Sequence, residues 1–181
     1  MDESSLPLNL AALAFSVLAI ITSTTIALRQ SRLMHHANLL PILTEIFDEF
    51  RASEFKQHMA YVTGELWRQH PPGAIGFDDL SDSARRHAGT VSSYFNTVGI
   101  LVANRIISDL LVASYMGRSI LQAWRHLEPY IRSERRLRDD DSWNLFFENL
   151  AAVTAENPPS KIDARLRLKR MSASTAWDRD A

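Results

Sequence analysis

The chain has 181 residues, a formal net charge of −1 and no cysteine. Its length is that of one domain with accessory segments, and its balanced charge excludes a global electrostatic attraction to nucleic acid. The lack of cysteine excludes disulfide scaffolds, thiolate metal sites and thiol nucleophiles.

The longest apolar stretch is LPLNLAALAFSVLAIITSTTIAL, residues 6–28, whose 23 positions carry no charge. A helix of this length is about 34 Å long, enough for a hydrocarbon core of about 30 Å. The residues before it include Asp2 and Glu3 and no basic residue, which is not typical of a cleaved signal peptide. The stretch therefore predicts a retained transmembrane helix, with a signal peptide or a buried helix as weaker alternatives.

The basic residues near this stretch predict its orientation. Arg29 and Arg32 follow it, whereas no Lys or Arg precedes it. By the positive-inside rule, we expect a single-pass protein of the cell membrane with its N-terminus outside and its C-terminal domain in the cytoplasm. The lipid bilayer is then a partner, and we expect headgroup contact from both arginines and from the basic tail. The tail residues are Lys161, Arg165, Arg167, Lys169 and Arg170, for which a solvated, frayed helix end is an equal alternative.

Within residues 6–28, Ala19, Ser23 and Ala27 recur every four positions, and Ala12 and Ser16 repeat this spacing one turn earlier, which places small residues on one helical face. Such a face allows close helix packing and favours a homodimer; a chance pattern is the alternative. The residues are Ala12, Ser16, Ala19, Ser23 and Ala27.

The remainder of the chain has helical periodicity and no strand-like alternation. We expect helices from 39 to 50, from 53 to 70, from 81 or 83 to 104, from 108 onward past Pro129, and from 143 to 157. In the third, the inward residues are Ala88, Val91, Phe95, Val98 and Val102. The predicted fold is all-α, with the transmembrane helix followed by a bundle of about five helices. The predicted domains are 1–34, a helical domain at 35–157, and a basic, partly disordered tail at 158–181.

Several residues predict local features of these helices. Ser53, Ser81 or Ser83, and Ser108 are suited to cap helix N-termini. Pro129 predicts a kink near Arg125. Gly89 and Gly99 fit a close crossing of two helices, and residues 139–141, three aspartates, are expected at the N-terminus of the last helix.

No motif for catalysis, phosphate binding or metal binding is present. The sequence has no G-x-S-x-G, Walker or G-x-G-x-x-G motif and no H-E-x-x-H or E-x-x-H pattern. His35 and His36 are adjacent and point in different directions on a helix, so they cannot chelate one metal. We therefore expect no catalytic residue, cofactor or metal ligand, and no enzymatic activity.

The segment WRHLEPYIRSERRLRDDD is the most distinctive polar stretch. Glu–Arg pairs four residues apart, 128 with 132 and 134 with 138, predict ion pairs on a helix surface. The functional alternative is a cationic patch of Arg132, Arg135 and Arg136 that binds an anionic ligand or an acidic partner. Asn96 and Asn104 lie on an apolar helix, where they either fix its register through hydrogen bonds or bind a ligand.

Together, NLLPILTEIFDEFRASEF, YFNTVGILVANRIISDLL, ILQAWRHLEPYIRSER and FFENL resemble a bacterial family known only as a domain of unknown function (number four-seven-six-zero). The resemblance covers nearly the whole chain and implies a membrane-associated helical protein, without catalytic residues to transfer. We therefore expect an interaction or scaffolding role with a homodimeric or unknown cytoplasmic protein partner. The alternative is a membrane-anchored sensor or effector that binds an anionic ligand or nucleotide through the arginine patch.

Overall fold

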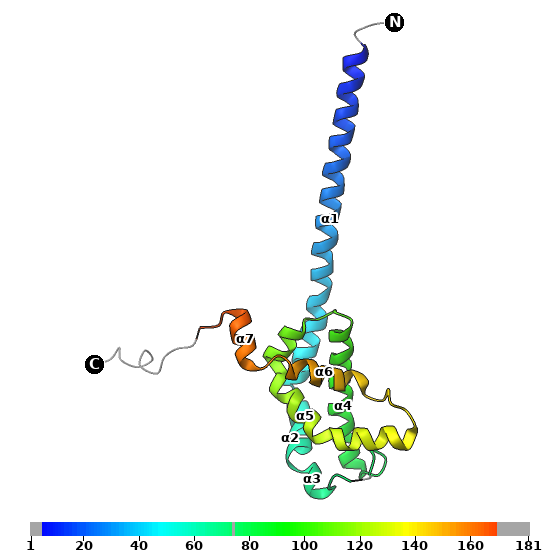
Figure 1. Ribbon diagram of the computed structural model, residues 1–181, viewed down its shortest axis with the longest axis vertical. Coiled ribbons are helices and arrows are strands. Elements are labelled where there is room, and N and C mark those ends of the chain that lie inside the picture. The colour runs from blue at the N-terminus through cyan, green and yellow to red at the C-terminus, as the bar shows by residue number, and fades with distance from the viewer. Residues whose placement is uncertain (1–4, 74, 170–181) are drawn as a thin grey trace, which may run out of the picture. The chain divides into compact units, whose positions relative to one another are not determined.

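The computed structural model describes the backbone of residues 5–73 and 75–169, and the side chains of residues 13, 15–26, 40–73 and 75–169. Within these residues every regular element is a helix, which confirms the all-α prediction. Figure 1 shows the elements in chain order. They are α1 (Ser5–Arg51), α2 (Ser53–Gly64), α3 (Leu66–Gln69), α4 (Asp82–Ala103), α5 (Asp109–Arg138), α6 (Leu145–Ala155) and α7 (Pro159–Leu166).

The chain divides into two compact units, Met1–Glu45 and Ile46–Ala181. In the first unit, the hydroxyl groups of Thr22 and Thr25 donate hydrogen bonds to the carbonyls of Leu18 and Ile21, one turn earlier, at 2.8 and 2.7 Å. This internal bonding lets hydroxyl residues occupy a helix without leaving their donors unpaired.

The prediction of a transmembrane helix at residues 6–28 is wrong: no helix in the described residues is both long and apolar enough to cross a membrane. Within the described side chains of this stretch, Ser16 and residues 22–25 carry hydroxyl groups, which make it less apolar than its lack of charge suggests. The predicted single-pass localisation and its orientation are corrected with it.

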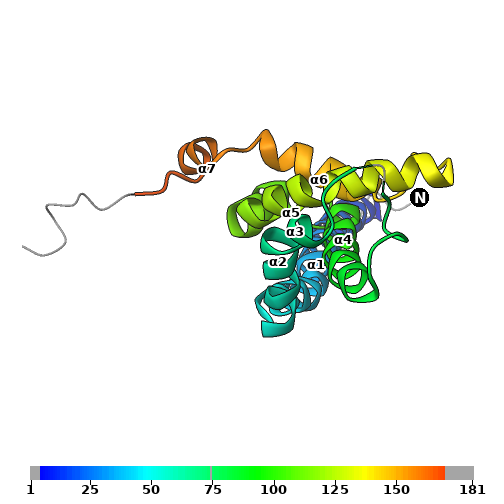
Figure 2. The ribbon, with the colours of Figure 1, turned by 90° about the horizontal axis from the view of Figure 1, so that it is seen from below.

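The core of the second unit is built around α4, which packs against α2, α5 and α6. Its predicted stripe is confirmed, since all five residues of the stripe are buried. Figure 2 shows α2 and α4 side by side below α5. Aromatic rings fill the space between these helices: the Phe95 ring contacts Phe55 at 5.9 Å and stacks on Phe147 at 5.4 Å between centroids.

Serine caps begin two of the long helices at the predicted positions. Ser81 accepts a hydrogen bond from the N–H of Ala84, and Ser108 accepts one from Leu111. The prediction for Ser53 is wrong by one position, because Ala52 precedes the first turn of α2 and no side chain caps it. The N–H three residues after Ser53, that of Lys56, already bonds to the carbonyl of Ala52.

The two interior glycines of α4 differ in what surrounds them. A Cβ atom on Gly99 would lie 2.1 Å from the backbone oxygen of Phe146, whereas one on Gly89 would meet nothing within 4 Å. The close crossing predicted for glycine is therefore confirmed at Gly99, where α4 and α6 approach each other. Gly89 has no such role.

Pro129 lies inside α5, and Figure 1 shows this helix changing direction between its green and yellow parts. Proline removes the hydrogen bond to the carbonyl four residues earlier, that of Arg125. The next carbonyl, that of His126, accepts a hydrogen bond from the indole N–H of Trp67 at 2.9 Å. The interrupted part of α5 thus receives a donor from α3.

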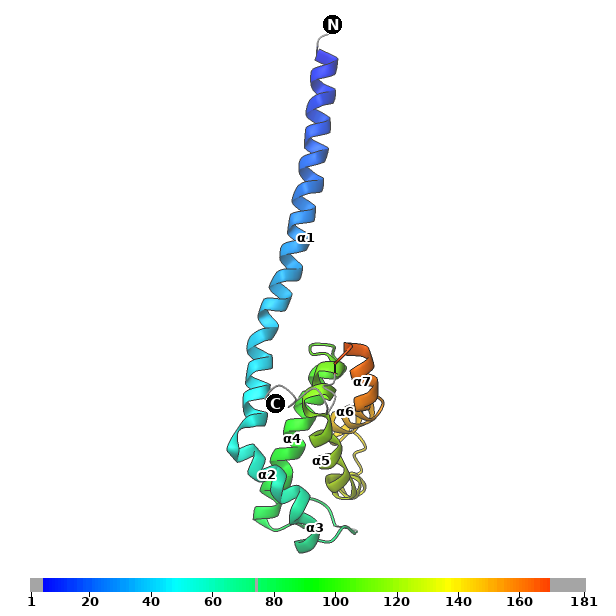
Figure 3. The ribbon, with the colours of Figure 1, turned by 90° about the vertical axis from the view of Figure 1, so that its left-hand side faces the viewer.

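The aspartates at 139–141 precede the last long helix, as predicted, but they do not lie at its N-terminus, which begins at Leu145. Asp139 instead ends α5 in a left-handed conformation with φ 51°, and Asp140 accepts hydrogen bonds from the backbone and hydroxyl of Ser142. The acidic residue in the first turn of α6 is Glu148. Figure 3 shows α7 following α6, and α7 packs on α5.

Candidate functional site

A groove with an aromatic floor lies between α2 and α5, and we call it the α2–α5 groove. Its volume is about 350 Å³. α2 contributes most of its wall, α5 contributes Ser119 and Gln122, and the end of α1 contributes Phe50. The lining residues are Phe50, Phe55, Lys56, Met59, Ala60, Thr63, Ser119 and Gln122.

The floor of the groove continues into an exposed apolar strip on α5. Leu111 and Tyr115 are 40% and 44% exposed. Together with Ser119 they are spaced four residues apart, so the three side chains lie along one face of α5. The Tyr115 ring contacts Phe50 at 5.7 Å and Phe47 at 4.5 Å between centroids. The strip therefore adjoins the aromatic part of the groove through the contact of Tyr115 with Phe50.

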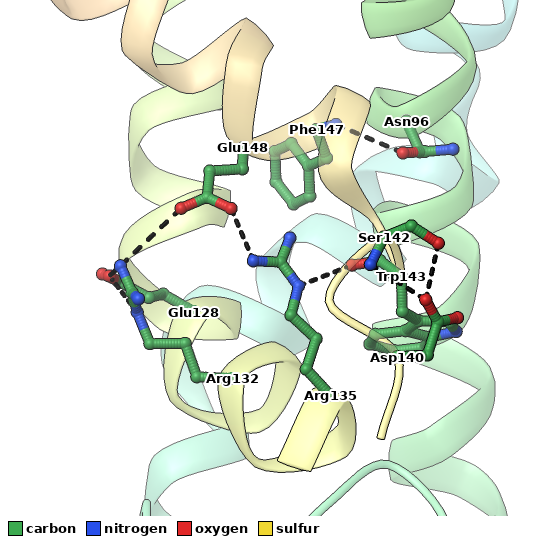
Figure 4. A network of polar contacts seen from close by, with 9 residues as sticks. All are labelled: Asn96, Glu128, Arg132, Arg135, Asp140, Ser142, Trp143, Phe147 and Glu148. Carbon is green, nitrogen blue, oxygen red and sulfur yellow. Dashed lines mark hydrogen bonds and ion pairs between the residues drawn. The ribbon is translucent and has the colours of Figure 1, made fainter. Parts of the chain in front are cut away.

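The predicted arginine patch belongs to an ion-pair network that joins α5 to α6, drawn in Figure 4. Arg135 is 11% exposed and donates from Nη1 to Glu148 at 2.6 Å and from Nε to the Trp143 carbonyl at 2.8 Å. Arg132 is 54% exposed and lies 2.7 Å from Glu128 and 3.7 Å from Glu148. Arg136 is exposed.

The ion pairs of this network limit how readily the arginine patch can bind an anion. Two of its three cations already contact carboxylates, so an added anion would compete with Glu128 and Glu148 for the same guanidinium groups. Anion binding by Arg132, Arg135 and Arg136 stays a prediction. The pairing of residues 128 and 132 expected from their spacing is confirmed.

The second predicted pair, Glu134 with Arg138, is not a surface pair. Arg138 donates a hydrogen bond to Glu134 as predicted. However, the Glu134 side chain is only 2% exposed, and it also accepts a hydrogen bond from the N–H of Phe77 at 2.6 Å. Arg138 reaches Asp78 at 3.0 Å. The pair therefore holds the loop before α4, where Gly76 leaves room for the carboxylate: a Cβ there would lie 2.3 Å from Glu134 Oε2.

A pair of histidines that was not predicted from the sequence lies at the contact of α2 with α4. The Nδ1 atoms of His58 and His87 are 2.8 Å apart. The Tyr61 ring stacks on His87 at 4.4 Å, and Glu54 lies 4.0 Å from Nε2 of His58. Residues 29 positions apart on two helices give no periodic signal, although Glu54 and His58 do have the i, i+4 spacing that could have drawn attention to His58.

No group of three or more possible metal ligands occurs among the described residues. A pocket of about 280 Å³ next to the histidine pair is lined by Glu49, Ala52, Glu54, Phe55, His58, Arg86 and Thr90. It therefore combines charged side chains of both signs with one face of Phe55, which also lines the α2–α5 groove.

The other predicted site residues lie outside these features. Ser16, Ala19 and Ser23 are exposed on α1, and the side chains of Ala12 and Ala27 lie outside the described residues. Lys161, Arg165, Arg167 and Lys169 are exposed on or after α7, whereas the side chains of Arg29, Arg32 and Arg170 are not described. Helix pairing and headgroup contact by these residues stay untested predictions.

The described residues form an all-helical fold with a partly apolar groove between α2 and α5. The chain belongs to the family described as domain of unknown function (DUF4760), which matches residues 8–153. The match contains the groove, the histidine pair and the ion-pair network, and it confirms the resemblance found in the sequence motifs. No curated protein and no solved structure matches the chain.

Proposed function

We propose that this chain is a protein-interaction module and that the α2–α5 groove binds an amphipathic helical segment of a partner protein. The observation that carries the proposal is the apolar lining formed by half-buried Phe50 and Met59 beside buried Phe55, which adjoins exposed Tyr115 through Phe50. Apolar grooves between helices bind such segments through large side chains spaced at i, i+3, i+4 and i+7.

The composition of the floor suits this mode of binding. Aromatic rings offer large contact areas, and the flexible thioether of Met59 adapts to different side-chain shapes. Phe50 and Phe55 pack against each other at 5.9 Å between centroids, so the floor is formed before a partner arrives. A formed site lowers the entropic cost of binding.

The rim of the groove indicates the charge of the partner. Lys56 lines the groove, and Arg118 is exposed one turn before Gln122 on the same face of α5. Two cations beside an apolar floor favour a helix that carries acidic residues next to its apolar face.

A library of amphipathic helical peptides displayed on phage tests the proposal. We expect selected peptides to share apolar residues at helical spacing together with acidic neighbours. Met59→Glu places a carboxylate on the floor and is expected to weaken binding at least tenfold. Leu166→Glu, the same kind of change on exposed α7, is the matched control and leaves binding unchanged.

Two outcomes would overturn the proposal. One is a set of selected peptides without a common helical pattern. The other is equal binding to the native chain and to the Met59→Glu variant, which would place the peptide elsewhere on the surface.

A further inference from the structure

The contact between His58 and His87 joins two helices by their side-chain nitrogens. The two Nδ1 atoms are 2.8 Å apart, and the ring planes meet at 58°. At this distance one Nδ1 must carry a hydrogen and the other must offer a lone pair. The contact therefore depends on the number of protons bound to the pair.

The first added proton is compatible with this contact, because an imidazolium can donate from Nδ1 to a neutral ring. A second proton gives both Nδ1 atoms a hydrogen and both rings a positive charge. Two donors with like charges at this distance repel each other. The hydrogen bond between α2 and α4 is then lost.

Charged groups surround the pair on three sides. From α2, Glu54 lies 4.0 Å from His58 Nε2. Glu49 and Arg86 line the adjoining pocket from α1 and α4, and Tyr61 stacks on His87. The α5 side chains against α2, Ser119 and Gln122, are uncharged.

The same helix carries the wall of the α2–α5 groove. His58 precedes Met59, and Phe55, one turn earlier, lines both the pocket beside the histidine pair and the groove. A displacement of α2 from α4 would therefore move the floor on which the partner helix rests.

We propose that the His58–His87 pair is a pH-sensitive lock, whose double protonation loosens α2 from α4 and disrupts the α2–α5 groove. The inference concerns regulation of the groove and rests on the proposed function for its biological meaning. Acidification weakens partner binding, and neutral pH restores it.

The electrostatic environment of His87 supports the direction of the effect. Burial, then His58, then Arg86 lower the pKa of His87 below its ordinary value. The unfolded chain therefore takes up this proton at about pH 6.5, before the folded chain does. The stability that depends on the unprotonated ring is present above this pH and declines as the pH falls through it.

Hydrogen exchange of the α2 backbone amides in the full chain, at pH 7.5 and pH 5.5, tests the lock without a partner. After correction for the intrinsic exchange rates, we expect protection of residues 55–62 to fall by about tenfold at pH 5.5, because loss of the contact between α2 and α4 opens α2 more often. His58→Asn/His87→Asn retains neutral hydrogen-bonding groups near the two Nδ1 positions and should show no such fall. His126→Asn, which changes a histidine outside the pair, should keep the native pH dependence.

Equal protection at both pH values in the native chain, or the same fall in the double variant, would overturn the lock. Binding of a selected helical peptide at pH 7.5 is measured in parallel. If protection falls as expected but no peptide binds the groove at either pH, the lock stands and the proposed function fails.

Discussion

The side-chain oxygen of Asn96 on α4 accepts a hydrogen bond from the backbone N–H of Phe147, in the first turn of α6, at 3.2 Å. Asn144, which precedes α6, makes no side-chain cap. Asn96 therefore acts as a cap supplied by a neighbouring helix and fixes the position of α6 on α4, as Figure 4 shows. Asn96 was predicted to fix the helix register through hydrogen bonds, and the partner in this bond is the backbone of Phe147.

Asn96→Ala is expected to lower the free energy of unfolding by about 1 kcal/mol, the usual effect of losing a helix cap. Asn104→Ala is the matched control, because the Asn104 side chain bonds only to the Ile100 carbonyl of its own helix and is exposed. Urea unfolding of both variants measures the difference. An equal decrease in the free energy of unfolding of both variants would show that the bond to Phe147 does not stabilise the fold more than the local bond of Asn104 does.

Glu134→Gln and Glu128→Gln compare a buried and an exposed Glu–Arg pair on the same helix. Glu134 is 2% exposed and accepts hydrogen bonds from both Phe77 and Arg138. Its replacement should therefore lower the free energy of unfolding by about 2–3 kcal/mol. Glu128 is part of a surface pair, so its replacement should lower the free energy of unfolding by at most about 0.5 kcal/mol. Thermal unfolding of the two variants provides the measurement, and similar melting temperatures would contradict the assignment.

Gly99→Ala and Gly89→Ala should change stability in opposite directions. A methyl group at 99 would collide with the backbone of Phe146, so we expect a loss of about 1–3 kcal/mol. At 89 the space is open, and alanine should stabilise α4 by up to about 1 kcal/mol. Denaturant unfolding distinguishes the two, and a stabilising Gly99→Ala would disprove the close crossing of α4 and α6.

Stability should decline at alkaline pH through two buried tyrosines. Burial, with a smaller contribution from Tyr61, raises the pKa of Tyr130 to about 12; burial and then Glu49 raise that of Tyr94 as well. Because the unfolded phenol loses its proton near pH 10, the stabilisation is complete below that pH and is lost between about pH 10 and 12. Urea unfolding between pH 8 and 11 should show a shallower decline for Tyr130→Phe; an unchanged slope would contradict the assignment.

Much of the helical fold could be predicted because each long helix carries its own local signals. The spacing from Ala88 to Val102 marks the buried face of α4, and Ser81 and Ser108 mark helix starts. The lack of charge was a weaker guide at residues 6–28, because it takes no account of the hydroxyl side chains at residues 22–25, and no helix in the described residues is both long and apolar enough to cross a membrane.

The groove and the histidine pair could not be predicted, because they depend on how separate helices pack. His58 and His87 meet only when α2 lies on α4. Likewise, the i, i+4 spacing of Glu134 and Arg138 predicts the pair itself, but only the loop containing Phe77 buries it. Periodicity identifies the face of a helix and does not identify the neighbour of that face.

Methyl NMR of the full chain, with a selected helical peptide added, measures occupancy of the groove. The methyl group of Met59 reports on the groove, and that of Met116, which is buried in the core, serves as an internal reference. We predict that the Met59 resonance shifts and shows intermolecular contacts with apolar peptide side chains, whereas Met116 shows no contact with the peptide. A bound peptide that leaves Met59 unshifted and without contacts would contradict binding in the α2–α5 groove.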